Sequence, residues 1–244
     1  MAKTVLITGA SRGIGRSTAI SFASRGYQVA LNYCADTAAA EKTAEIARSF
    51  GVFAEIYRAD VSDPAAVAAM VREVTEQFGS IDVLVCNAGI AQQRLFQDIT
   101  DEEWNHMLGV HLSGTFYCCR AVLPQMIQRK EGRIITVSSM WGLTGGACEA
   151  HYSAAKAGVI GLTKALAKEV GPSGITVNCV APGVIQTDMC ADYDEQTLQA
   201  LREEAPLGRL GTPQDVADAI EFLASEKAGF LTGQVLSPNG GIVI

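Results

Sequence analysis

The sequence predicts an α/β protein built on a doubly wound parallel sheet of about seven strands, with helices on both faces. Short runs rich in β-branched residues alternate with longer helical patterns along the chain. A glycine-rich turn, Thr8 to Gly15, also joins the first expected strand to the first expected helix. Because no linker, repeat or low-complexity segment interrupts the alternation, residues 1–244 are expected to form one domain.

Each expected strand is a short apolar run bounded by turn residues. In chain order the strands are expected at Lys3–Ile7, Gln28–Tyr33, Val52–Tyr57, Asp82–Cys86, Arg133–Val137, Thr176–Val180 and Gln234–Leu236. The longer patterns predict helices at Gly13–Arg25, Thr37–Phe50, Pro64–Phe78, Asp101–Lys130, Tyr152–Val170 and Pro213–Ala224. Pro64 suits the first turn of its helix, and Gly79 ends it.

Because each right-handed crossover helix returns the chain to the same edge, the strands should run parallel in a Rossmann-type sheet. Ligands of such sheets bind at the carboxyl ends of the strands. The long excursion over residues 183–205 interrupts the rhythm before the last helix. We expect this excursion to act as a lid over the substrate.

Charge and cysteine usage exclude several classes of protein. The net charge of −7 offers no electrostatic basis for binding nucleic acid or an anionic membrane. The seven cysteines form no CxxC pair, which is typical of reduced thiols in a cytoplasm. The three histidines lack metal-ligand spacing, so no metal site is expected. The first residues have neither the pattern of a signal peptide nor that of a membrane span, so neither is expected.

The glycine turn predicts a phosphate site. Its spacing, G-x-x-x-G-x-G over Gly9, Gly13 and Gly15, lets backbone N–H groups and a helix N-terminus approach a pyrophosphate. The second strand ends near Asn32 without the carboxylate that would grip a ribose 2′-hydroxyl. Arg12 can meet a 2′-phosphate with a fork of donors, so NADPH/NADP+ is the expected cofactor rather than NADH.

A second group of residues predicts acid–base chemistry. Tyr152 and Lys156 lie four residues apart and therefore share one face of the expected helix. A nearby ammonium should lower the pKa of the Tyr152 phenol toward working pH and make it a general acid. Ser139, at the end of the preceding strand, can hydrogen-bond a substrate carbonyl oxygen as negative charge grows on it.

Taken together, these motifs resemble the short-chain dehydrogenase/reductase family over essentially the whole chain. The matching strings are TGASRGIG (8–15), Asp60-Val61, Asn87-Ala88-Gly89, Ser139, YSAAK (152–156), Asn178, Pro182-Gly183, PLGRLGTPQDVA and TGQVLSPNGG. The resemblance implies catalysis by Ser139, Tyr152 and Lys156. It implies cofactor contacts from Gly9, Ser11, Arg12, Gly13, Ile14, Gly15, Asn32, Asp60, Val61, Asn87, Ala88, Gly89, Tyr152, Lys156, Pro182, Gly183, Val184 and Thr187. It also implies a homotetramer.

Two positions depart from the family pattern. Cys86 replaces an asparagine of N-N-A-G, and His111 replaces the asparagine that helps relatives hold a water in the proton path to the lysine. An imidazole can also donate and accept hydrogen bonds, but it is larger and titrates near neutrality. Two alternatives follow: His111 takes over the function of the asparagine, or it impairs turnover. A non-catalytic NADP(H)-binding protein is the alternative from a different class, which the intact Ser139, Tyr152 and Lys156 argue against.

The substrate is expected to be a small or carrier-bound carbonyl compound. Within the family the chain is similar to bacterial 3-oxoacyl-[acyl-carrier-protein] reductases, although Ser173 lacks the basic character some of them use for docking carrier protein. Arg129 and Lys130 remain as half of such a patch. The string 138–156, with Trp141, Cys148 and Glu149, also looks like reductases of the 5-aminopentanone modification on elongation factor P. A carboxylate at Glu149 would suit that amine-bearing ketone.

Overall fold

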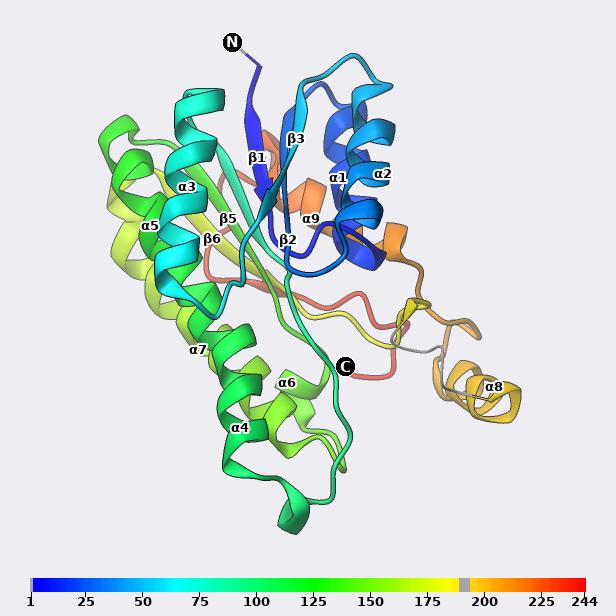
Figure 1. The fold of residues 1–244 in the computed structure, drawn as a ribbon. Coiled ribbons are helices and arrows are strands. Elements are labelled where there is room, and N and C mark those ends of the chain that lie inside the picture. The colour runs from blue at the N-terminus through cyan, green and yellow to red at the C-terminus, as the bar shows by residue number, and fades with distance from the viewer. Residues whose placement is uncertain (1, 189–193) are drawn as a thin grey trace.

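The structure is a computed structural model and describes residues 2–188 and 194–244. Within these residues seven strands form one parallel sheet in the order β3-β2-β1-β4-β5-β6-β7 (Figure 1). The strands are β1 (Thr4–Ile7), β2 (Gln28–Tyr33), β3 (Ala54–Arg58), β4 (Val83–Cys86), β5 (Gly132–Val137), β6 (Ile175–Val180) and β7 (Val235–Leu236). The predicted Rossmann-type sheet is therefore confirmed.

Helices cover both faces of the sheet, with α1, α2 and α9 on one side and α3, α5 and α7 on the other (Figure 1). The bounds are α1 (Gly13–Ser24), α2 (Thr37–Arg48), α3 (Pro64–Phe78), α4 (Asp101–Leu108), α5 (Gly114–Arg129), α6 (Trp141–Thr144), α7 (Ala150–Val170), α8 (Glu195–Glu204) and α9 (Pro213–Ala224). Alternate residues of β1 enter the two cores, Leu6 on the α3 side and Val5 and Ile7 on the α1 side. Burial on both faces explains why the strands read as continuous apolar runs.

The largest departure from the expected elements concerns the long helix Asp101–Lys130. It is divided into α4, a π-helical turn at Gly109–Ser113, and α5. Such a turn inserts one residue into the ladder of hydrogen bonds and re-aims the side chains on it, which apolar periodicity does not reveal. The helix expected to start at Tyr152 begins two residues earlier, at Ala150. The short helices α6 and α8 were not predicted from the sequence.

The segment 183–205, expected to form a lid, contains α8 and also residues 189–193, which lie outside the described part of the chain. Its role as a lid stays a prediction. No helix among the described residues is long and apolar enough to cross a membrane. Over residues 2–188 and 194–244, no three His, Cys, Asp or Glu side chains gather where they could hold a metal ion.

Candidate active site

The glycine-rich loop between β1 and α1 has a shape that larger residues cannot adopt. Gly9 has φ +64°, and a Cβ there would lie 2.8 Å from Cα of Ala88. A Cβ at Gly15 would overlap the carbonyl oxygen of Gly9. No side chain caps α1 at its N-cap residue, Arg12, so the first N–H groups of the helix are left for a ligand. This cradle fits a pyrophosphate at a helix N-terminus.

Two asparagines predicted to bind the cofactor use their side chains to brace this loop. The Asn87 amide nitrogen donates to the carbonyl oxygens of Thr8 (2.9 Å) and Gly9 (3.1 Å). The Asn32 side chain is 2% exposed; it accepts from the backbone N–H of Gly9 at 3.3 Å and donates to the carbonyl of Ala59 at 3.0 Å. Because both amides are engaged within the protein, these residues shape the loop through their side chains.

The residues predicted for the cofactor lie at the carboxyl ends of neighbouring strands, where the topology brings them together. After β1 come Gly9, Ser11, Arg12, Gly13, Ile14 and Gly15; after β3, Asp60 and Val61; after β4, Asn87, Ala88 and Gly89; and after β6, Pro182, Gly183, Val184 and Thr187. The first and last groups meet directly, since a Cβ at Gly13 would contact Thr187 at 3.4 Å. Their contacts to a cofactor remain predictions.

Arg12 points from the glycine loop toward the segment that follows β6. Its guanidinium lies 3.6 Å from the carboxylate of Asp188, and both side chains are about 70% exposed. An ion pair this open to solvent contributes little to stability and is readily exchanged for another anion. No carboxylate ends β2. The nearest one along the chain, Asp36, caps α2 by accepting from the N–H of Ala39 at 2.9 Å.

Ser139, Tyr152 and Lys156 converge where β5 ends and α7 begins. Ser138 fixes this junction, because its hydroxyl donates to the carbonyl of Lys156 at 2.8 Å and its N–H donates to Val180 at 2.7 Å. The hydroxyl of Ser139 hydrogen-bonds Tyr152. The Lys156 ammonium lies 5.6 Å from the centre of the Tyr152 ring and donates to the carbonyl of Val137 at 2.8 Å.

Burial dominates the electrostatics of this pair. It raises the pKa of Tyr152 to about 12, a shift that the hydrogen bond from Ser139 opposes and the nearby Glu149 carboxylate assists. It lowers the pKa of Lys156 to about 8. The expectation that Lys156 lowers the pKa of Tyr152 is therefore wrong. The desolvated phenolate is too costly, and the ammonium is already turned to a backbone carbonyl.

His111 occupies the π-helical turn and packs edge-on against Tyr152, with ring centres 5.2 Å apart. Its Nε2 lies 2.8 Å from the carbonyl oxygen and 3.1 Å from the backbone nitrogen of Ile90, so it donates to the first or accepts from the second according to the tautomer. Nδ1 is buried and has no hydrogen-bond partner among the described residues. Burial first, and the Lys156 charge second, hold the pKa of His111 well below its usual value. The imidazole is thus neutral near pH 7. The expectation that it titrates near neutrality is wrong.

Comparison with known proteins agrees with this geometry. A family model described as Enoyl-(Acyl carrier protein) reductase matches residues 9–243. The 3-oxoacyl-[acyl-carrier-protein] reductase FabG of Staphylococcus aureus (strain N315) is 44% identical over 242 residues, covering 99% of this chain and 98% of that protein. FabG of Escherichia coli (strain K12) is 42% identical over 241 residues, with 98% and 97% covered. The chain belongs to the short-chain dehydrogenase/reductase family. It is an oxidoreductase that acts on carbonyl or alcohol groups with a nicotinamide cofactor.

One wall of the site in this short-chain reductase was missed from the sequence. The loop after Ile90 and the loop before α7 are joined by three successive contacts, Gln92 with His151, Gln93 with Glu149, and the N–H of Arg94 with the carbonyl of Cys148. Cys148 adopts φ +61°, unusual for a residue other than glycine. Burial raises the pKa of the Glu149 carboxyl beside Tyr152. The sequence pointed to Cys148 and Glu149 of this wall but not to its partners on the other loop, because no spacing rule links the two loops.

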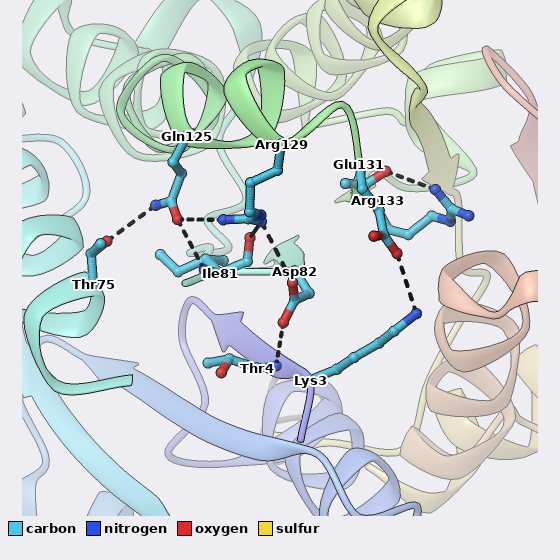
Figure 2. Close-up of polar contacts among 10 residues, drawn as sticks. Lys3, Thr4, Thr75, Ile81, Asp82, Gln125, Arg129, Glu131 and Arg133 are labelled. Carbon is cyan, nitrogen blue, oxygen red and sulfur yellow. Dashed lines mark hydrogen bonds and ion pairs between the residues drawn. The ribbon is translucent and has the colours of Figure 1, made fainter. Parts of the chain in front are cut away.

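The basic residue expected to help dock a carrier protein is engaged elsewhere. Figure 2 shows Arg129 bonded to the carbonyl of Ile81 at 2.7 Å, to Gln125 at 3.0 Å and to the carboxylate of Asp82 at 3.5 Å. Asp82 also accepts from the N–H of Thr4, where β1 begins. This network lies at the amino ends of the strands, away from Tyr152. Arg129 therefore ties α5 to the sheet in this reductase.

Proposed function

We propose that the chain reduces a ketone to a secondary alcohol with NADPH, and that a 3-oxoacyl thioester is the first candidate substrate. The observation that carries the proposal is the meeting of Ser139, Tyr152 and Lys156 at the carboxyl end of β5. The glycine loop, which fits a pyrophosphate, lies at the same edge of the sheet. The nicotinamide cofactor supplies the hydride when it is bound.

Tyr152 then donates the proton that the carbonyl oxygen needs. A pKa of about 12 keeps the phenol protonated over the whole working range, so the acid form is always present. The Lys156 ammonium, one helical turn away, stabilises the phenolate that remains after transfer. The Ser139 hydroxyl hydrogen-bonds the carbonyl oxygen while negative charge grows on it.

NADPH is proposed over NADH because Arg12 is a cation at the glycine loop and no acid ends β2. The ratio of kcat/KM for the two cofactors should favour NADPH by at least about tenfold, which corresponds to roughly 1.4 kcal/mol. Equal or better use of NADH would contradict this choice.

The thioester proposal draws on the curated relatives, which are named for reduction of 3-oxoacyl groups on acyl carrier protein. Leu95 and Phe96, which follow the contact of Arg94 with Cys148, and Leu143 of α6 are exposed apolar side chains that suit an acyl chain. Docking of a carrier protein cannot rely on Arg129, and the net charge of −7 slows the approach of an acidic partner. We therefore propose that the acyl thioester itself provides most of the recognition.

A ketone that carries an amine, such as the 5-aminopentanone group on a lysine of elongation factor P, is the second candidate. Glu149 favours it, because this half-buried carboxyl lies close enough to Tyr152 to raise the pKa of the phenol. The ammonium of such a substrate would favour the charged form of Glu149 and form a charge-assisted hydrogen bond with it.

Parallel assays of NADPH consumption with a 3-oxoacyl thioester and with an amino-ketone separate the two candidates. Glu149→Gln should lower kcat/KM for the amino-ketone about tenfold or more and leave kcat/KM for the thioester nearly unchanged. Glu102→Gln, an exposed change on α4, is the matched control. Failure of the wild-type protein to reduce either ketone would refute the proposed function.

We further propose a homotetramer in the cytoplasm. The family resemblance supports the assembly, and the reduced cysteines support the compartment.

A further inference from the structure

We infer that Arg58 is a second cationic donor for the adenosine 2′-phosphate of the cofactor and, with Arg12, sets the preference for NADPH. The inference rests on the proposed use of NADPH and adds to it a residue that neither the glycine motif nor the end of β2 identifies. Arg58 is the last residue of β3, the strand that flanks β2 at the edge of the sheet.

The register of the sheet determines where the Arg58 side chain points. Arg58 is paired with Tyr33, the last residue of β2. Side chains alternate between the two faces of a strand, and the preceding residue, Tyr57, packs in the core on the α3 side. Arg58 therefore lies on the opposite face, with α2. There its Nε donates to the carbonyl of Cys34 at 3.2 Å, which fixes the guanidinium beside the turn from β2 to α2.

The glycine loop approaches the same turn from the other side. The N–H of Ala10 donates to the carbonyl of Asn32 at 2.8 Å. Arg16 bridges the loop to the start of α2, because its Nη2 donates to the carbonyls of Ser11 at 2.8 Å and of Ala39 at 3.4 Å. Arg12 directly follows Ser11 in this loop. The turn after β2 is where a bound dinucleotide places its ribose 2′ substituent. Arg12 therefore approaches that position from the glycine loop, and Arg58 approaches it from β3.

The charges around the turn favour a phosphate. Arg58 is exposed and forms no ion pair within the described ranges 2–188 and 194–244. The carboxylates that follow β2 and β3 are engaged by local turns: Asp36 caps α2, and Asp60 accepts from the N–H and hydroxyl of Ser62 at 2.9 and 2.7 Å. A planar guanidinium held in this way offers its terminal nitrogens to a phosphate as a charged fork.

Two nucleotide fragments test the inference without any catalysis. Adenosine 2′,5′-bisphosphate carries the 2′-phosphate, and adenosine 5′-monophosphate lacks it. Calorimetry should show that Arg58→Gln weakens binding of the bisphosphate about tenfold and binding of the monophosphate less than twofold. Arg58→Lys should recover part of the loss. Arg72→Gln, which removes an equal charge from the exposed surface of α3, should change neither affinity.

The outcomes separate the inference from the proposed function. Undiminished binding of the bisphosphate by Arg58→Gln would overturn the role of Arg58, while a wild-type preference for the bisphosphate would still support NADPH. Equal binding of both nucleotides by the wild-type protein would instead overturn the NADPH preference, and the inference with it. Unchanged monophosphate binding by Arg58→Gln shows that the variant is folded, so a selective loss supports the inference directly.

Discussion

Replacement of His111 by asparagine should change how stability depends on pH. The folded protein holds the pKa of His111 well below the usual value because the ring is buried and, secondly, because Lys156 is near. The unfolded chain takes up a proton on this histidine as pH falls through about 6.5, and the folded protein does not. The free energy of unfolding of the wild-type protein therefore falls as pH drops through about 6.5, and the slope that His111 contributes becomes small above about pH 7.5.

The magnitude follows from linkage. A histidine that stays neutral when folded costs about 1.4 kcal/mol of stability between pH 7.5 and pH 5.5. His111→Asn removes that share of the decline, while His106→Asn, a change at an exposed histidine of α4, should leave it intact. Carboxyl groups with lowered pKa values, such as Glu103, act below about pH 4.5 and stay outside this window.

Urea unfolding at the two pH values measures the effect. At pH 7.5 the variant should be less stable by about 1–3 kcal/mol, because the edge-on contact with Tyr152 and the hydrogen bond to Ile90 are altered. The difference from the wild-type protein should then shrink at pH 5.5. A constant difference would show that His111 takes up its proton in the folded protein just as it does in the unfolded chain, and would refute the reasoning.

Four further outcomes follow. Lys156→Ala should lower the rate of ketone reduction about 10²-fold or more and weaken cofactor binding; in the wild-type protein, kcat/KM should fall as pH rises through about 8, where burial makes Lys156 lose its charge. Asn87→Ala breaks two hydrogen bonds to the carbonyls of Thr8 and Gly9, so chemical denaturation should show a loss of about 2–3 kcal/mol. Light scattering should show a symmetric tetramer, and a stable monomer at micromolar concentration would contradict the proposed assembly.

The sheet could be predicted from the sequence because its strands are buried on both faces. A run such as Val83–Cys86 has no alternative to a central strand, and the glycine turn fixes where β1 ends. The strand bounds differ from expectation by one or two residues, as at β3, because hydrogen-bond pairing rather than apolarity sets the last residue. The π-helical turn at Gly109–Ser113 left no mark on the periodicity, so it was missed.

The candidate site could be predicted as a set of residues but not as an electrostatic environment. Spacing alone places Lys156 one turn after Tyr152, and the structure agrees. The direction in which the pKa of Tyr152 shifts depends on burial and on the hydrogen bond of Lys156 to the carbonyl of Val137. Residue spacing predicts neither of these. The contacts that join Gln92 to His151, and the bond from Arg58 to Cys34, arise between segments distant in sequence.

The account centres on Tyr152 as the proton donor, and Tyr152→Phe tests it most directly. The change removes the phenolic oxygen, keeps the ring that packs against His111, and leaves the loops around the glycine motif untouched. The rate of NADPH-dependent ketone reduction under single-turnover conditions should fall about 10²–10⁴-fold, with cofactor affinity changed far less. A Tyr152→Phe protein that reduces the same ketone at the wild-type rate would show that the proton comes from another group and would contradict the roles given to Ser139, Tyr152 and Lys156.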